Sequence, residues 1–157
     1  MRELNLEARP ENLDRVLEFL DKELEELNCP RRVSVQLHVS VEEIFVNIAN
    51  YAYNPTVGYA RVQAEVEPAK DREPAVLVMR FIDSGIPFNP LEREDPDITL
   101  SGMERQIGGL GIYMVKKRMD DVSYERRDDK NILTIRKKIT EDSDTVKSKA
   151  AGVSRKF

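Results

Sequence analysis

The sequence contains very little of the two residues that build disulfide frameworks and zinc sites. Among its 157 residues there is one cysteine, Cys29, and one histidine, His38. One residue of each type excludes a disulfide framework, a zinc finger and a His-rich metal site, and it excludes a cysteine–histidine protease unless this pair meets in space. Any chemistry must therefore come from carboxylates, amides, backbone groups and a bound cofactor.

Long apolar runs and an excess of positive charge are also missing. No apolar run approaches the roughly 20 residues that a membrane-spanning helix requires. Residues 1–3 lead straight into mixed sequence, without the apolar segment of a signal peptide. The formal net charge is −4, which argues against a dedicated nucleic-acid-binding protein. We therefore expect a cytoplasmic protein that contacts neither membrane nor nucleic acid directly.

What is present is an ordinary globular composition, with 40% hydrophobic and 34% charged residues. The chain is long enough to bury a core of its own. After Thr140 the residues are polar and small. We expect one domain over residues 1–140, followed by a disordered tail over 141–157.

Hydrophobic periodicity predicts three helices and five strands. Apolar residues at spacings of three and four predict helices from Pro10 to Leu27, from Arg32 to about Asn54, and after Gly111. Alternating or continuous apolar runs predict strands over residues 4–8, 57–67, 75–82, 122–127 and 132–139.

The order of these elements predicts the fold class. Adjacent strands indicate antiparallel hairpins, and helices grouped apart from them indicate one sheet with helices on one face. We therefore expect an α+β fold, a two-layer sandwich with a mixed, mainly antiparallel sheet. Residues 83–108 show no clear period, and a loop of this length inside a domain is usually functional when it is ordered.

A first polar cluster lies on the second predicted helix. Its members project from one helical face at positions i, i+4, i+7 and i+8: Glu43, Asn47, Asn50 and Tyr51. A carboxamide oxygen can ligate a hard cation, while a carboxylate one turn earlier takes a proton from a hydroxyl or water. The same groups can equally pair with each other or face water, and this pattern is frequent by chance.

A second cluster, residues 83–88, follows the most apolar predicted strand. Asp83 stands where the strand gives way to a turn, which suits a carboxylate that accepts a hydrogen bond from a ligand amine. Gly85 would let the backbone approach a flat ring closely. The alternative is an ordinary turn, since Asp-Ser-Gly before a proline is common turn chemistry.

A third cluster is the run Gly108-Gly109-Leu110-Gly111, which opens the third predicted helix. Free backbone amides at a helix N-terminus bind anions, and glycines let phosphates reach them. A hinge or a strained turn is the alternative. The run is neither a Walker loop, because no Lys-Ser/Thr pair follows it, nor a Rossmann fingerprint, because no strand immediately precedes it.

Together, in this order and on these elements, the three clusters resemble the GHKL nucleotide-binding family, named for gyrase, a heat-shock chaperone, histidine kinases and the mismatch-repair protein MutL. Within that family the sequence is similar to bacterial anti-sigma factor serine/threonine kinases. The resemblance runs from about Leu4 to Lys138 and is strongest over residues 43–53, 83–90 and 108–121. It implies the Bergerat ATP-binding fold and the cofactors ATP and Mg²⁺.

The resemblance implies roles for residues of the first cluster. Glu43 would be the general base, and Asn47 would hold magnesium near the phosphates. Asn50 and Tyr51 would contact the nucleotide, although the family often has a histidine where this chain has Tyr51.

It also implies roles for the remaining candidates. Asp83 would accept from the adenine amine, with Gly85 and Phe88 beside the ring. Gly109, Leu110 and Gly111 would wrap the phosphates, and residues 89–107 would form an ATP lid. Thr134 would support adenine recognition, and Arg105 is a candidate γ-phosphate partner by charge, although a solvated lid residue is the alternative.

The function that the resemblance implies is phosphorylation of an anti-anti-sigma partner and sequestration of a sigma factor by a homodimeric kinase. The alternative is a non-catalytic nucleotide-binding or partner-sequestering module on the same fold. A histidine-kinase catalytic domain is disfavoured, because His38 lies in the same helix as Glu43 and no upstream dimerisation hairpin fits before it.

Overall fold

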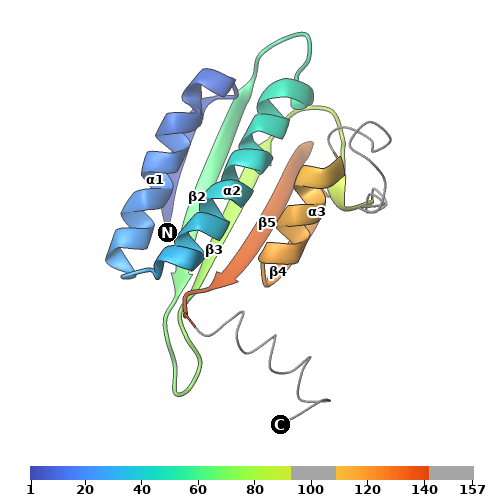
Figure 1. The fold of residues 1–157 in the computed structure, drawn as a ribbon. Coiled ribbons are helices and arrows are strands. Elements are labelled where there is room, and N and C mark those ends of the chain that lie inside the picture. The colour runs from blue at the N-terminus through green and yellow to red at the C-terminus, as the bar shows by residue number, and fades with distance from the viewer. Residues whose placement is uncertain (93–108, 142–157) are drawn as a thin grey trace.

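The computed structural model describes residues 1–92 and 109–141 and folds them into two layers. One layer is a five-stranded β-sheet, and the helices of the described residues all lie against the same face of it (Figure 1). The predicted α+β sandwich is therefore confirmed. Most of the predicted lid over 89–107, with Arg105, and nearly all of the predicted tail over 141–157 lie outside the described residues.

The strands of the sheet lie in the order β1-β2-β3-β5-β4. Their bounds are Arg2–Glu7 (β1), Tyr59–Glu67 (β2), Val76–Asp83 (β3), Asp121–Arg127 (β4) and Lys130–Lys138 (β5). Every pairing is antiparallel, so over the described residues the sheet is wholly antiparallel rather than mixed. The β2–β3 and β4–β5 hairpins are local, whereas the pairing of β5 with β3 brings the end of the domain back to its centre.

Alternation along the strands decides which side chains enter the core. On β2 the buried residues Ala60, Val62 and Ala64 stand at every second position, and a period of two places them on one face of the sheet. That face packs against the helices. The core between the layers includes Leu6, Val16, Leu20, Leu37, Val41, Phe45, Phe81 and Ile135. Burial of each large side chain contributes about 1.5–3 kcal/mol, so this core is the main source of stability.

The helices differ from their predicted bounds mainly at the end of the second one, while the first begins after a 3₁₀ turn and the third begins at Gly109 rather than after Gly111. They are α1 (Leu13–Glu26), α2 (Arg31–Asn47) and α3 (Gly109–Arg118), with short 3₁₀ turns at Pro10–Asn12 and Pro90–Glu92. α2 ends earlier than predicted because the chain widens into a π-helical turn over Ile48–Ala52. Such turns are rare and frequently occur at functional sites, and this one borders the cavity described below.

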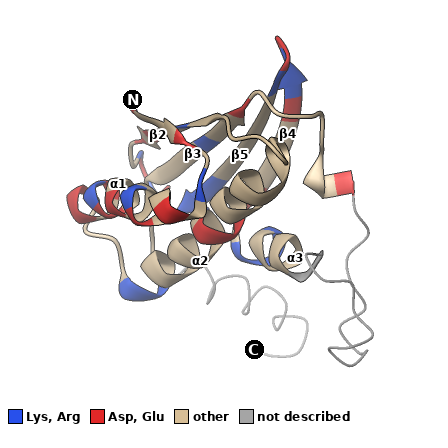
Figure 2. Cartoon of the chain, turned by 90° about the horizontal axis from the view of Figure 1, so that it is seen from above, with Lys and Arg blue, Asp and Glu red and all other residues tan. Residues whose placement is uncertain are grey.

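The opposite face of the sheet is polar. Its cross-strand ion pairs join Glu3 to Arg61, Glu65 to Arg80, and Glu67 to Arg136. Exposed pairs of this kind contribute about 0–1 kcal/mol each, so this face adds solubility more than stability. Seen from above, the two layers are distinct, and acidic residues are concentrated on α1 (Figure 2). No helix among the described residues has both the length and the apolar character that a membrane crossing requires.

Candidate functional site

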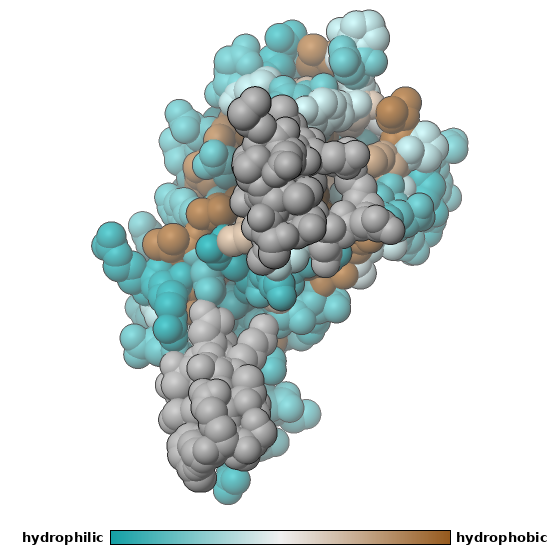
Figure 3. All heavy atoms as spheres, turned by 45° about the vertical axis from the view of Figure 1, so that its right-hand side comes forward, coloured by the Kyte–Doolittle hydropathy of each residue, from teal (hydrophilic) through white to brown (hydrophobic). Residues whose placement is uncertain are grey.

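A cavity of about 420 Å³ opens beside the π-helical turn. Its walls come from the end of α2, the end of β3, the beginning of β5 and the first turns of α3. It is lined by Ile44, Asn47, Ile48, Tyr51, Ala52, Phe81, Asp83, Ile86, Phe88, Pro90, Ile112, Tyr124, Asn131 and Leu133. An apolar lining with a few convergent polar groups is typical of a small-molecule site. Apolar side chains also reach the surface on this side of the molecule, among hydrophilic ones (Figure 3).

The carboxylate of Asp83 lies at the end of β3 and faces this cavity, with 6% of the residue exposed. Its Oδ1 accepts hydrogen bonds from the Gly85 amide, at 2.9 Å, and from Asn131 Nδ2, at 2.9 Å. Burial raises the pKa of Asp83, while these two hydrogen bonds and the charge of Arg126 oppose that rise. A carboxylate so placed can accept a hydrogen bond from an amine on a ligand.

Gly85 is required by a close contact within the protein. A Cβ at this position would lie 2.3 Å from the carbonyl oxygen of Ala52. The turn after β3 is thereby pressed against the π-helical turn, and the Ile86 amide donates to the same Ala52 oxygen at 3.1 Å. Tyr53 adds a second link, because its hydroxyl accepts from the Ser84 amide at 2.7 Å. The glycine therefore fixes the wall of the cavity.

Glu43 and Asn47 lie one turn apart on α2, as the spacing predicts. Asn47 Nδ2 donates to Glu43 Oε2 at 3.0 Å. Because the carboxylate only accepts, this bond leaves the amide oxygen of Asn47 available to a ligand, and Asn47 is one of the residues that line the cavity. Carboxamide and carboxylate oxygens suit a hard cation such as Mg²⁺ that also binds phosphate oxygens. The residues present therefore fit the implied metal.

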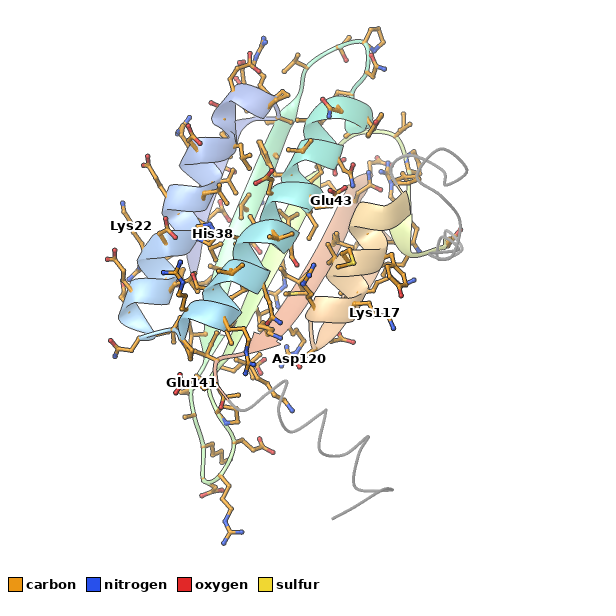
Figure 4. The ribbon with its side chains drawn as sticks, viewed as in Figure 1. Lys22, His38, Glu43, Lys117, Asp120 and Glu141 are labelled. Carbon is orange, nitrogen blue, oxygen red and sulfur yellow. The ribbon has the colours of Figure 1, made fainter. Side chains whose placement is uncertain are left out.

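The first and third clusters meet at the N-terminal turn of α3. A Cβ on Gly111 would lie 2.0–2.4 Å from the carboxyl atoms of Glu43, so the absence of a side chain is what admits the carboxylate there. Figure 4 shows Glu43 on α2 facing the N-terminal end of α3. That end of a helix favours negative charge. Gly109 and Leu110 belong to the same first turn of α3, whereas the helix was predicted to begin after Gly111.

Three further predicted residues come from the π-helical turn after α2 and from the second cluster, and they differ in position. Tyr51 and Phe88 line the cavity at its opening, with 60% and 50% of each residue exposed. Asn50 is exposed to solvent and does not line the cavity. The structure thus brings Tyr51 and Phe88 to the same site as Asp83 and leaves Asn50 outside it.

Thr134 lies on the wrong face of the sheet for the predicted role. Asn131 pairs directly with Asp83 in the β3–β5 register. Thr134 is three positions further along β5, and an odd spacing places its side chain on the face opposite the helices. Asn131 therefore occupies the place expected for Thr134. The alternation of Asn131 with the apolar residues Leu133 and Ile135 was the signal in the sequence that could have identified it.

The single cysteine and the single histidine do not meet. His38 Nε2 lies 2.6 Å from Asp21 Oδ1 on α1, and the two helices are side by side in Figure 4. Cys29 instead contacts the carbonyl oxygen of Pro30 through its sulfur, at 3.5 Å, and burial raises the pKa of its thiol. No cysteine–histidine nucleophile is formed.

Comparison with known proteins decides the family. The model of the histidine kinase-like ATPase domain matches residues 6–137. The chain belongs to this family. The histidine kinase-like ATPase assignment confirms the resemblance to GHKL proteins and implies that the domain binds ATP.

The chain is also similar to a named enzyme of the same broad type. It is 28% identical over 105 residues to the serine/threonine-protein kinase BtrW of Bordetella bronchiseptica. The aligned region covers 66% of this chain and 70% of the relative. Together with the histidine kinase-like ATPase match, this similarity supports ATP-dependent kinase activity in general.

Proposed function

We propose that the protein is a magnesium-dependent serine/threonine kinase that phosphorylates an anti-anti-sigma partner and sequesters a sigma factor. The observation that carries the catalytic part is the meeting of Glu43, Asn47 and Gly111 beside the Asp83 cavity. The similarity to a serine/threonine-protein kinase supports the choice of acceptor. The partners and a homodimeric state are supported by the resemblance of the three motifs to anti-sigma factor kinases.

The arrangement assigns a role to each end of the cavity. The base of ATP would enter beside Asp83, which accepts from its exocyclic amine. The phosphates would extend toward the first turn of α3, where backbone amides offer donors. Asn47 would hold magnesium through its amide oxygen, and the ion, when bound, neutralises phosphate charge.

Glu43 would act as the general base. It would orient a serine or threonine hydroxyl of the partner and accept its proton as the hydroxyl oxygen bonds to the γ-phosphorus. The bond from that phosphorus to the β–γ bridging oxygen breaks, and ADP leaves. Water in place of the hydroxyl would give ATP hydrolysis, so tight exclusion of water by a docked partner would favour transfer.

The test is transfer of a phosphoryl group to a partner. The purified protein is incubated with ATP and magnesium together with a candidate anti-anti-sigma protein from the same organism, and intact mass spectrometry follows that partner. We expect a gain of one phosphoryl group, absent when the acceptor serine or threonine is changed to alanine.

Two other results have clear meanings. ATP binding with no transfer to any such partner would contradict the kinase proposal and favour an ATP-binding module that sequesters its partner. A failure to bind ATP in calorimetry would contradict the catalytic proposal as a whole.

A further inference from the structure

Asn131 forms a hydrogen-bonded hub at the wall of the cavity. It lies at the beginning of β5, directly opposite Asp83, with 7% of the residue exposed. Its Nδ2 donates to Asp83 Oδ1 at 2.9 Å and to the Ile86 carbonyl oxygen at 2.8 Å. Its Oδ1 accepts from the Tyr124 hydroxyl at 2.5 Å and from the Phe88 amide at 3.2 Å. Both ends of the amide are therefore bonded.

These partners fix the direction in which the amide points. The Phe88 N–H can only donate, so it must face the amide oxygen, and the Ile86 carbonyl can only accept, so it must face the nitrogen. A rotation that exchanged oxygen and nitrogen would break both bonds at once. The N–H groups of Asn131 are thereby held toward Asp83.

The hub determines which oxygen of Asp83 a ligand can use. Oδ1 already receives two N–H groups, from Asn131 and from the Gly85 backbone. Oδ2 takes no part in these bonds and remains an acceptor on a residue that lines the cavity. Hydrogen bonds of this kind stabilise the ionised carboxylate, which can accept a proton donor but cannot donate.

We propose that Asn131, held by Tyr124, is a positioning residue for base selection: it keeps Asp83 an acceptor, so that the cavity prefers a purine with an exocyclic amine to one with a carbonyl oxygen at that position. This inference rests on the proposed nucleotide-binding function. Adenine presents the amine, and hypoxanthine presents the carbonyl oxygen. An ionised carboxylate attracts the first and repels the second.

Other charged or titratable groups act on Asp83 from neighbouring elements. Arg126 on β4 favours its ionised form, whereas burial disfavours it. The Tyr53 hydroxyl, beyond the π-helical turn, interacts with the Asp83 charge. Tyr124 reaches Asp83 only through Asn131, and Glu43 lies at the α3 end of the site. Loss of Asn131 would remove one of the two direct hydrogen-bond donors to Asp83. The rise in the pKa of Asp83 that burial causes would then be less opposed.

The experiment compares ATP with inosine triphosphate as calorimetric ligands of the full-length protein. The wild type should bind ATP more tightly. In Asn131→Leu, which has similar size and no donor, the preference for ATP should fall by about tenfold, the effect expected for one hydrogen bond to a charged group. The matched control is the same substitution at exposed Asn5 on β1, which should keep the wild-type preference.

A second variant keeps the test decisive if Asn131→Leu does not fold. Tyr124→Phe removes one hydroxyl and leaves the ring, and it should lower the preference for ATP by about threefold. Preference unchanged in the folded variants would overturn the positioning role while leaving nucleotide binding intact. Failure of the wild type to bind either nucleotide would instead overturn the proposed function, and this inference with it.

Discussion

The two ends of the cavity are built in different ways. At the strand end, defined by Asp83 and Asn131, the side chains are fixed by strand register and by several hydrogen bonds. At the helix end, defined by Glu43, Asn47 and Gly111, the one side-chain hydrogen bond lies within α2, and the close approach of Gly111 to Glu43 joins α3 to α2. The strand end depends on the sheet, whereas the helix end depends on where α3 packs against α2.

This difference suggests that the two ends have different functions. An end held by strand register and several hydrogen bonds suits recognition of a flat nucleobase, because the ligand meets groups that need no rearrangement. An end formed between two helices suits chemistry on phosphates, because a small movement of α3 changes the surroundings of Glu43, the proposed general base. Substitutions at the two ends should therefore separate binding from catalysis.

The largest effect is expected for Glu43→Ala at the helix end. Removal of a general base lowers transfer by roughly 10²–10⁴-fold, while ATP affinity should stay within about threefold because Asp83 is untouched. The measurement is single-turnover phosphoryl transfer, with calorimetry for binding. Glu42→Ala is the matched control, since Glu42 is the exposed neighbour on the same helix. Equal rates for the two variants would exclude Glu43 as the base.

At the strand end, Asp83→Asn should show the opposite pattern. The variant keeps the size of the side chain and an oxygen for Gly85 and Asn131, but it loses the charged acceptor. ATP affinity should fall by about 10–100-fold, as expected for a hydrogen bond to a charged group. Calorimetry with Asp14→Asn, an exposed residue of α1, as control measures this. An ATP affinity equal to that of the wild type would show that the adenine ring does not bind at Asp83.

Alanine substitutions of Gly85 and Gly111 compare the two ends directly, with a smaller expected effect. Gly85→Ala meets the backbone oxygen of Ala52, and Gly111→Ala meets the side chain of Glu43. Backbone yields less than a side chain, so Gly85→Ala should lower the free energy of unfolding more, by about 1–3 kcal/mol.

Gly111→Ala should cost less stability but displace Glu43, so that it lowers the transfer rate more than Gly85→Ala does. Urea unfolding and single-turnover rates measure the two effects on the same samples. If both variants lose stability and rate in equal proportion, the two ends do not differ in the way that the contacts indicate.

Much of the fold follows from the sequence, because periodicity reports which face of each element is buried. The three clusters also come together as their order predicts. What the sequence did not predict depends on register and on contacts between distant residues. Thr134 was predicted and Asn131 was not, because alternation along the strand shows which residues share a face but not that Asn131 pairs with Asp83. The π-helical turn over Ile48–Ala52 likewise has no periodic signature.

The smallest predicted effect is the pH dependence of ATP affinity that Asp83 causes at the strand end. Burial raises the pKa of Asp83 above its usual value of 3.8. Because the pKa is higher in the folded state, the contribution of Asp83 to stability is fully present below the unfolded value and is lost as pH rises through the folded value. ATP binding has the opposite sign, since only the ionised form accepts from an amine. Affinity should therefore weaken as pH falls through the folded pKa.

Comparison with Asp83→Asn isolates this effect from titration of the nucleotide and of other carboxylates. The ratio of wild-type to variant affinity, measured by calorimetry over a series of pH values, should decline on the acid side, with a midpoint above 3.8. In Asn131→Leu the midpoint should move to higher pH, because one donor to the carboxylate is gone. A ratio that does not change with pH would show that the charge of Asp83 is not what the base reads, and recognition at the strand end would then rest on shape alone.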